Sequence, residues 1–238
     1  MDRLLRIGIF YDGQYFYNVS NYYRHIHAKK ARISIGGLHE YIRHKVSENC
    51  DVPVNLCQIV DSHYFRGRQS AQVAKEKQLY NERSFDEILM DENIVAHYLP
   101  LKQNQSGFKE KGVDIWLALE AYELAMYKRF DVLVLIASDG DYVPLVRKLN
   151  TLGTRVMLLA WDFKYTDKQG NVKETKTAYQ LLDEVSFPIK MHDEINDEKN
   201  SDKEIMKGLF LPPKGQSDCP EEASEIENTT VDDENETV

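Results

Sequence analysis

The sequence is short of cysteine and contains no long apolar run, and each absence excludes a class of protein. Its 238 residues include three cysteines, Cys50, Cys57 and Cys219, whose odd number and spacing match neither a metal-binding nor a redox motif. We therefore expect free thiols in a reducing cytoplasm rather than a disulfide framework or a zinc site. The apolar runs, such as residues 132–137, have the length of a strand, whereas a membrane-spanning helix needs about 20 residues.

The N-terminal segment also lacks the features of a secretory signal. Residues 1–6 run straight into a patterned segment, without an extended apolar stretch or a small-residue cleavage site. These absences predict a cytoplasmic protein that does not contact the membrane. The chain has 42% hydrophobic and 11% aromatic residues, which is enough to build the core of one α/β domain.

Charge is distributed unevenly along the chain. The net charge is −9, but residues 191–238 alone carry 15 acidic and 4 basic side chains, so residues 1–190 are slightly positive. We predict one folded domain over residues 1–190 and an acidic tail over 191–238. The tail has few apolar residues from Asp193 onward and is expected to be mostly disordered. It could screen a basic surface or only keep the protein soluble, and the sequence leaves both interpretations open.

Strand-sized apolar segments alternate with helical patterns through residues 1–190. Helical stripes are formed by residues 38, 42 and 46, by residues 115, 119, 122 and 126, and by residues 143, 146 and 149. The alternation predicts a doubly wound, mainly parallel sheet. Residues 66–92 are polar and predict an outer helix or helix pair, and residues 162–175 predict a loop or hairpin. The predicted strands are residues 5–11, 54–60, 94–99, 131–137 and 154–160.

Four aspartates are placed where such a sheet gathers its functional groups. Asp12 directly follows the first strand, Asp139 and Asp141 follow the strand 131–137, and Asp114 lies at the start of a helix. The carboxyl ends of parallel strands and the starts of the following helices meet at one edge. Like charges that converge there are costly unless a cation neutralises them. Oxygen ligands of this kind suit a hard divalent ion.

Each aspartate also has a purely structural explanation. Asp141 could cap the helix that contains Pro144, Asp114 could stabilise its own helix through the dipole, and Asp12 could hold a turn. Taken singly, these explanations are as good as the functional one. The run Ser138-Asp139-Gly140-Asp141 favours a site, because it places two acids after a buried strand where one cap would suffice.

Three segments together resemble the NYN domain, and more closely its LabA-like branch within the PIN-like nuclease superfamily. They are residues 7–13 (IGIFYDG), 111–114 (KGVD) and 134–146 (VLIASDGDYVPLV), and the resemblance spans about residues 5–190. It implies a PIN-like three-layer α/β/α sandwich with a mainly parallel central sheet. It also implies catalytic, metal-binding roles for Asp12, Asp114, Asp139 and Asp141 around Mg²⁺ or Mn²⁺. Family members often carry Asn shortly after the first Asp-Gly, where this chain has Gln14 and Tyr15.

The function that follows is a metal-dependent ribonuclease that hydrolyses RNA phosphodiester bonds, with single-stranded RNA as the expected partner. Cationic side chains beside Tyr64 and Phe65 could pair with phosphates while the rings stack on bases. The aromatic residues 15–17, 22 and 23 are expected mainly to pack a helix on the sheet. The predicted substrate-binding residues are Gln14, Arg66, Arg68, Lys111 and Ser138.

Two other functions are compatible with the same residues. A non-catalytic regulator that binds RNA or nucleotide could retain the acidic pocket. A small-phosphomonoester hydrolase would normally need a second Asp two residues after Asp12, and here that residue is Gln14. The sequence also leaves open whether the protein is a homodimer.

Overall fold

The computed structural model describes residues 3–104, 107–166, 170–201 and 203–211. Six strands form one central sheet in which every neighbouring pair is parallel, in the order β10-β7-β6-β1-β2-β3. The strands are β1 (Leu5–Asp12), β2 (Cys57–Arg68), β3 (Val95–Pro100), β6 (Val132–Ile136), β7 (Arg155–Ala160) and β10 (Phe187–Lys190). β6 is buried along its whole length, as its uninterrupted apolar sequence predicts for a strand covered on both faces.

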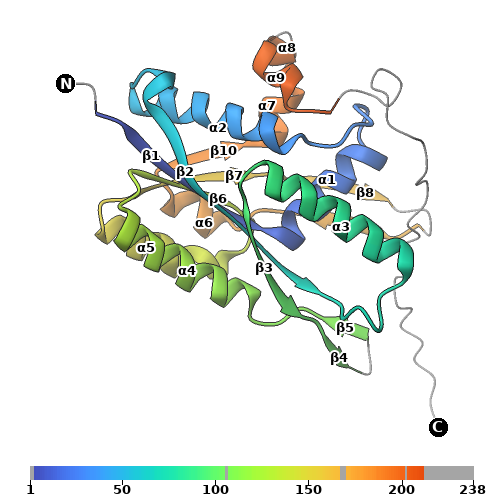
Figure 1. Ribbon diagram of the computed structural model, residues 1–238. Helices are drawn as coiled ribbons and strands as arrows, with labels where there is room; N and C mark the ends of the chain where they lie inside the picture. The colour runs from blue at the N-terminus through green and yellow to red at the C-terminus, as the bar shows by residue number, and fades with distance from the viewer. Residues whose placement is uncertain (1–2, 105–106, 167–169, 202, 212–238) are drawn as a thin grey trace.

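Helices cover both faces of this sheet and complete a three-layer sandwich (Figure 1). One face packs against α1 (Gly13–His25), α2 (Ile35–Cys50), α3 (Glu76–Asp91) and α7 (Met191–Asn196). The other packs against α4 (Val113–Lys128), α5 (Val143–Thr151) and α6 (Tyr179–Glu184). Alternate residues of β1 supply the two cores, with Ile9 and Tyr11 on the first side and Phe10 on the second. The predicted α/β/α fold is confirmed.

Shorter elements decorate this frame. β8 (Phe163–Thr166) and β9 (Val172–Thr175) pair antiparallel, so of the loop or hairpin predicted for residues 162–175 the structure shows the hairpin. β4 (Lys102–Asn104) and β5 (Gly107–Lys109) form a second antiparallel ribbon. The remaining elements are the 3₁₀ helices η1 (Val54–Leu56) and η2 (Gly140–Tyr142), and the short helices α8 (Glu198–Ser201) and α9 (Glu204–Gly208). None of the helices in the described part of the chain combines the length and apolar character that crossing a membrane requires.

The second strand differs from the prediction at both ends. Residues 54–56 form η1, and β2 begins at Cys57 and continues to Arg68, well past the apolar run that marked it. The polar end of β2 is held by pairing with β3, since Arg66 lies opposite Tyr98 and Arg68 lies opposite Pro100. Arg66 and Arg68 are therefore strand residues, whereas the prediction placed them in an outer helical segment over residues 66–92; the helix of that segment is α3, which begins at Glu76.

The apolar stripe predicted for α4 faces solvent. Ile115 is 62% exposed and Leu119 is 65% exposed, whereas the buried residues of this helix are Val113, Leu117, Ala121 and Ala125. Both faces of α4 are apolar, so periodicity alone could not identify the inner one. The face that packs on the sheet ends in two alanines, whose small side chains let the helix approach the strands closely.

The C-terminal boundary also needs correction, because part of the predicted tail is folded. Residues 193–211 were expected to be mostly disordered, yet Ile195, Met206 and Leu209 are buried in the core on the α2 side. Residue 210 forms a β-bridge with Ile33, and the Leu209 carbonyl accepts the Ser34 N–H. A few well-spaced apolar residues are sufficient to dock a short segment, even where the average composition is acidic. Residues 212–238, including Cys219, lie outside the described residues.

A candidate active site at the switch point of the sheet

The order of the strands has a switch point between β1 and β6, and we call the region outside the carboxyl ends of these two strands the crevice. From β1 the chain passes to β2 and β3 on one side, and it then returns to β6 on the other side of β1. In open parallel sheets, ligands bind outside the carboxyl ends of the strands at the point where the strand order reverses. Asp12 is the last residue of β1, and Asp139 follows β6 by three residues. The two aspartates therefore flank the switch point, as the sequence predicted on the condition that both strands are central.

Asp12 combines a capping role with an unfavourable electrostatic environment. Its Oδ1 accepts the Tyr15 N–H at 3.0 Å and caps α1, and its Oδ2 accepts the Tyr142 hydroxyl at 3.4 Å. Burial, with a smaller contribution from the charge of Glu110, raises the pKa of Asp12 to about 6, although these hydrogen bonds act to lower it. The ionised carboxylate lacks enough compensation from the protein, so a cation at this position would be favourable.

The turn that follows Asp12 fixes where its carboxylate points. A Cβ on Gly13 would lie 2.5 Å from the Phe65 carbonyl oxygen and 2.6 Å from the Tyr64 ring, so only glycine fits. The Tyr64 hydroxyl donates to the Gly13 carbonyl at 3.0 Å. At the next turn, the Tyr15 hydroxyl accepts the Trp161 N–H at 2.6 Å and anchors α1 to the end of β7.

In the Ser138–Asp141 segment, Asp141 does not take the capping role that was the structural alternative to metal binding. The N-cap of the following helical turn is Asp139, whose Oδ1 accepts the Asp141 N–H at 3.0 Å, and not Asp141 itself. Both aspartates are exposed, so both carboxylates reach solvent at the crevice. Ser138 is half-buried, and its carbonyl accepts the Ala178 N–H at 2.9 Å.

Three of the four predicted aspartates lie around one buried hydroxyl. Tyr142 is 1% exposed, and burial, followed by the charges of Asp12, Asp114 and Asp139, raises the pKa of its phenol far above the ordinary value. Asp114 is half-buried in the first turn of α4, and this helix begins directly after Gly112, which has a left-handed backbone (φ 85°). Asp141 is not among the charges that act on this phenol most strongly.

These carboxylates do not form a closed metal cage. In the part of the chain that the structure describes, no three His, Cys, Asp or Glu side chains are grouped closely enough to hold a metal ion. This arrangement still suits Mg²⁺, which is commonly held by one or two carboxylates and completes its shell with water and substrate phosphate oxygens. The ligands available here are hard carboxylate oxygens, and the pKa of Asp12 is raised. Both features fit an open site of this kind.

Two residues of the site have no role in the sequence prediction. Glu110 accepts the Gly67 N–H through Oε2 at 2.8 Å, and its charge acts on Asp12. Tyr142 reaches Asp12 from the opposite side of the crevice. Their neighbours could have pointed to them, because Glu110 immediately precedes Lys111-Gly112 and Tyr142 immediately follows Asp141.

The side chains predicted to bind substrate differ in whether they already have partners within the protein. Gln14 is exposed, and its amide donates to Asn18 Oδ1 at 3.1 Å, while Lys111 is exposed. The Arg66 guanidinium lies 4.0 Å from the centre of the Tyr17 ring.

Arg68, in contrast, is already paired. Its guanidinium contacts Asp86 at 2.7 Å and Glu82 at 3.3 Å, and it lies 3.6 Å above the centre of the Tyr98 ring. This guanidinium ties α3 to β2 and β3. Since its charge is neutralised by two carboxylates, the geometry favours a structural role over a phosphate contact.

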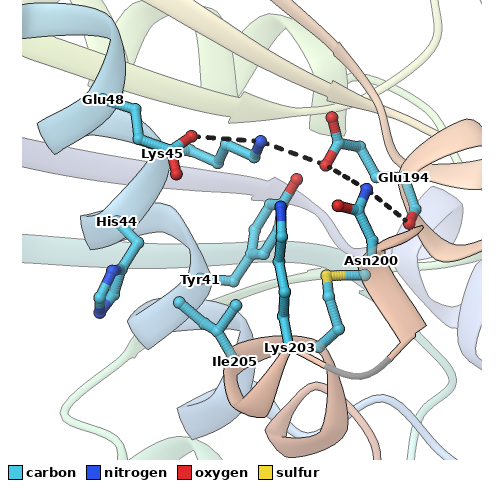
Figure 2. Close-up of a pocket in the computed structure, with 9 residues that line it drawn as sticks. Tyr41, His44, Lys45, Glu48, Glu194, Asn200, Lys203 and Ile205 are labelled. Carbon is cyan, nitrogen blue, oxygen red and sulfur yellow. Dashed lines mark hydrogen bonds and ion pairs between the residues drawn. The ribbon is translucent and has the colours of Figure 1, made fainter. Parts of the chain in front are cut away.

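A separate small cavity of about 40 Å³ lies between α2 and the C-terminal helices (Figure 2). Three of its charged groups are paired with one another, since Lys45 contacts both Glu48 at 3.3 Å and Glu194 at 3.1 Å. It contains none of the predicted site residues, so the crevice at the switch point remains the candidate site.

Residues 6–186 match the NYN domain family, and this match includes the switch-point aspartates. The chain belongs to the NYN domain family. Members of this family are generally nuclease-like. The fold of this NYN domain also resembles the crystal structure of a protein of unknown function from Vibrio parahaemolyticus, with a TM-score of 0.54 and 16% sequence identity over 89% of this chain and 99% of that one. This likeness concerns the fold alone, and a search of curated proteins finds no match.

Proposed function

We propose that this NYN domain is a metal-dependent ribonuclease that hydrolyses RNA phosphodiester bonds. The observation that carries the proposal is the position of Asp12 at the end of β1 and of Asp139 three residues after β6, because these two adjacent strands flank the switch point. Asp12 is a carboxylate that the protein leaves under-compensated, as its raised pKa indicates. Placement within the LabA-like branch, and a cytoplasmic location in keeping with the free thiols of Cys50 and Cys57, belong to the same proposal.

The residues of the crevice have distinct roles in this proposal. Asp12 and Asp139 would hold Mg²⁺ or Mn²⁺ directly, with Asp114 and Asp141 contributing directly or through water. Such an ion supplies charge stabilisation on the phosphate and eases deprotonation of a water. Tyr142 holds the Asp12 carboxylate in place through its hydroxyl. Lys111 and Arg66 provide cationic groups near the crevice for the phosphates of single-stranded RNA.

A cleavage assay with charge-neutralised variants tests the proposal. Full-length protein incubated with single-stranded RNA and Mn²⁺ should cleave it, and Asp139→Asn should lower the rate by at least about 100-fold, in the range that follows loss of one main electrostatic contact in an active site. Asp91→Asn is the matched control, because Asp91 is exposed at the end of α3 and distant in sequence from every site segment. Equal cleavage by both variants would refute the assignment.

A second candidate function is a non-catalytic regulator that binds RNA or nucleotide at the same crevice. It is favoured by the absence of a three-residue metal cluster in the described part of the chain and by Gln14 where relatives often have Asn. RNA binding by the wild-type protein without any cleavage in Mg²⁺ or Mn²⁺ would select this function over the first.

A further inference from the structure

A cationic stretch of the chain follows the active-site turn and is not used by the proposed function. Residues 13–39 contain no Asp or Glu, although the sequence as a whole has 39 acidic residues. The same stretch contains Arg24, Lys29, Lys30 and Arg32. It comprises α1, the connection to α2 and the beginning of α2. Positive charge without acidic neighbours in sequence is therefore concentrated in the segment that follows Asp12.

One ring contact and the electrostatic effects around Arg32 link two of these residues, Arg24 and Arg32, to Arg66. The Arg66 guanidinium stacks on Tyr17. Arg32 lies close enough to Tyr17 and Arg24 to be affected by both, since desolvation and the like charge of Arg24 lower the pKa of Arg32 and Tyr17 opposes this effect. We call Arg66, Tyr17, Arg32 and Arg24 the arginine strip.

The arginine strip begins beside Asp12. The hydroxyl of Tyr64 bonds to the Gly13 carbonyl, directly after Asp12. In the pairing of β1 with β2, Asp12 lies opposite Phe65, and Arg66 is the next residue of β2. An anion bound to Arg66 would therefore lie near the crevice, and the strip extends away from it along α1.

The arginines of the strip have no carboxylate partners within the described ranges of the chain. The ion pairs of these ranges involve other arginines, including Arg43, Arg68 and Arg147, but not Arg24, Arg32 or Arg66. Bringing like charges together without a counter-charge is unfavourable, and phosphate oxygens compensate guanidinium groups well through paired hydrogen bonds.

We infer that the arginine strip binds consecutive phosphates of an RNA strand whose scissile bond lies at Asp12. The inference rests on the proposed function and adds a path for the substrate: Arg66 contacts the phosphate nearest the crevice, and Arg32 and Arg24 contact phosphates farther along the strand. Such contacts are independent of base sequence and sensitive to salt.

The double variant Arg24→Gln/Arg32→Gln tests the strip in the full-length protein. Fluorescence anisotropy with a 20-nucleotide single-stranded RNA in EDTA measures binding without cleavage. We expect about tenfold weaker binding at low salt and a slope of log Kd against log salt that is shallower by about 1.4, since each phosphate contact contributes about 0.7. The Arg24→Lys/Arg32→Lys variant keeps both positive charges and should therefore keep the wild-type slope. A protein that had lost its fold would not show this slope.

Arg129→Gln provides the matched control. Arg129 is exposed and lies before β6, at the amino ends of the strands, so the same chemical change there should leave RNA affinity within twofold of the wild type. If the wild type cleaves RNA and the double variant binds it as tightly, the strip is refuted and the proposed function stands. If the wild type neither binds nor cleaves RNA, the proposed function itself fails.

One further outcome assigns the strip to a different partner. Residues 214–238 contain nine acidic side chains, so a peptide of this sequence is a suitable probe for a competing protein ligand. If the double variant loses binding to that peptide while its RNA affinity is unchanged, the strip recognises an acidic protein segment, and the inference is overturned.

Discussion

The capping role of Asp12 and the metal-binding role proposed for it make opposite demands on its charge. As the N-cap of α1 it needs only an oxygen acceptor, which a neutral side chain also provides. As a metal ligand it must be ionised, and ionisation is opposed by burial and by Glu110. At neutral pH the ionised Asp12 therefore lowers the stability of the fold, and a bound cation would offset this cost.

The first prediction concerns Asp12→Asn in the absence of divalent ions. The raised pKa means that the folded state holds the Asp12 proton up to about pH 6, whereas the unfolded state releases it near pH 4, so wild-type stability falls as pH rises through this interval. Asparagine keeps the oxygen that caps α1 and avoids the free-energy cost of ionising a buried carboxyl group. The variant should exceed the wild type in free energy of unfolding by about 1–2 kcal/mol at pH 7 and by much less at pH 4.

Urea unfolding at the two pH values measures this difference. Added Mn²⁺ should raise the melting temperature of the wild type and leave that of Asp12→Asn nearly unchanged. A pH dependence identical in both proteins would show that Asp12 is not under-compensated.

The second prediction concerns Tyr142→Phe. The hydroxyl of Tyr142 donates to Asp12 and lowers the pKa of that carboxyl, so its removal should raise this pKa. The acid limb of the pH profile of kcat/KM should move to higher pH, while the ring continues to fill the core. Measurement of cleavage between pH 5 and 8 tests this shift, and a displacement toward lower pH would contradict it.

The sequence predicts only some of the side chains that share the crevice. The offsets of Asp12 and Asp139 from their strands indicate the edge of the sheet. The sequence does not reveal the direction of each carboxylate, and so the capping role fell to Asp139 instead of Asp141. Tyr142 and Glu110 were not predicted because their contacts depend on packing across the crevice.

Among the elements, the turn between β1 and α1 bears the strictest constraint. Gly13→Ala should cost about 1–3 kcal/mol, because the new methyl group meets a backbone oxygen that cannot move aside. Gly208→Ala is the control, since a Cβ there has no neighbour within 4 Å and alanine favours the helix. Thermal unfolding of the two variants measures the contrast, and equal stabilities would contradict the packing described for the turn.

The docking of the C-terminal segment gives a prediction at the same scale. Leu209 is fully buried, so Leu209→Ala should lower the free energy of unfolding by about 2–5 kcal/mol. Leu211 is 44% exposed, and Leu211→Ala should change it by less than about 0.5 kcal/mol. Similar effects of the two substitutions, measured by urea unfolding, would mean that the segment does not pack as the structure has it.

Elements were predictable where a pattern had one explanation. β6 is apolar throughout, and the structure buries it completely. α4 is apolar on two faces, so its orientation depends on how closely alanines allow it to approach the sheet. The end of β2 depends on pairing with β3, which is a contact between segments far apart in the sequence.

At the scale of the whole molecule, the deciding feature is the strand order. Alternation of strands and helices predicts a parallel sheet but does not say which strands are neighbours. The structure places β1 beside β6, and this adjacency brings the carboxylates of two distant segments to one crevice. The arginine strip lies on the α1 side of the same crevice, so acidic and basic surfaces are separated in a way that suits a polyanionic substrate.

An anomalous diffraction map from a crystal soaked in Mn²⁺ tests the central claim most directly. We predict a peak within coordination distance of the carboxylates of Asp12 and Asp139, and no peak there in crystals of Asp12→Asn. A map without manganese at the switch point, or with manganese bound only elsewhere, would contradict the proposal that this NYN domain carries a metal-dependent active site.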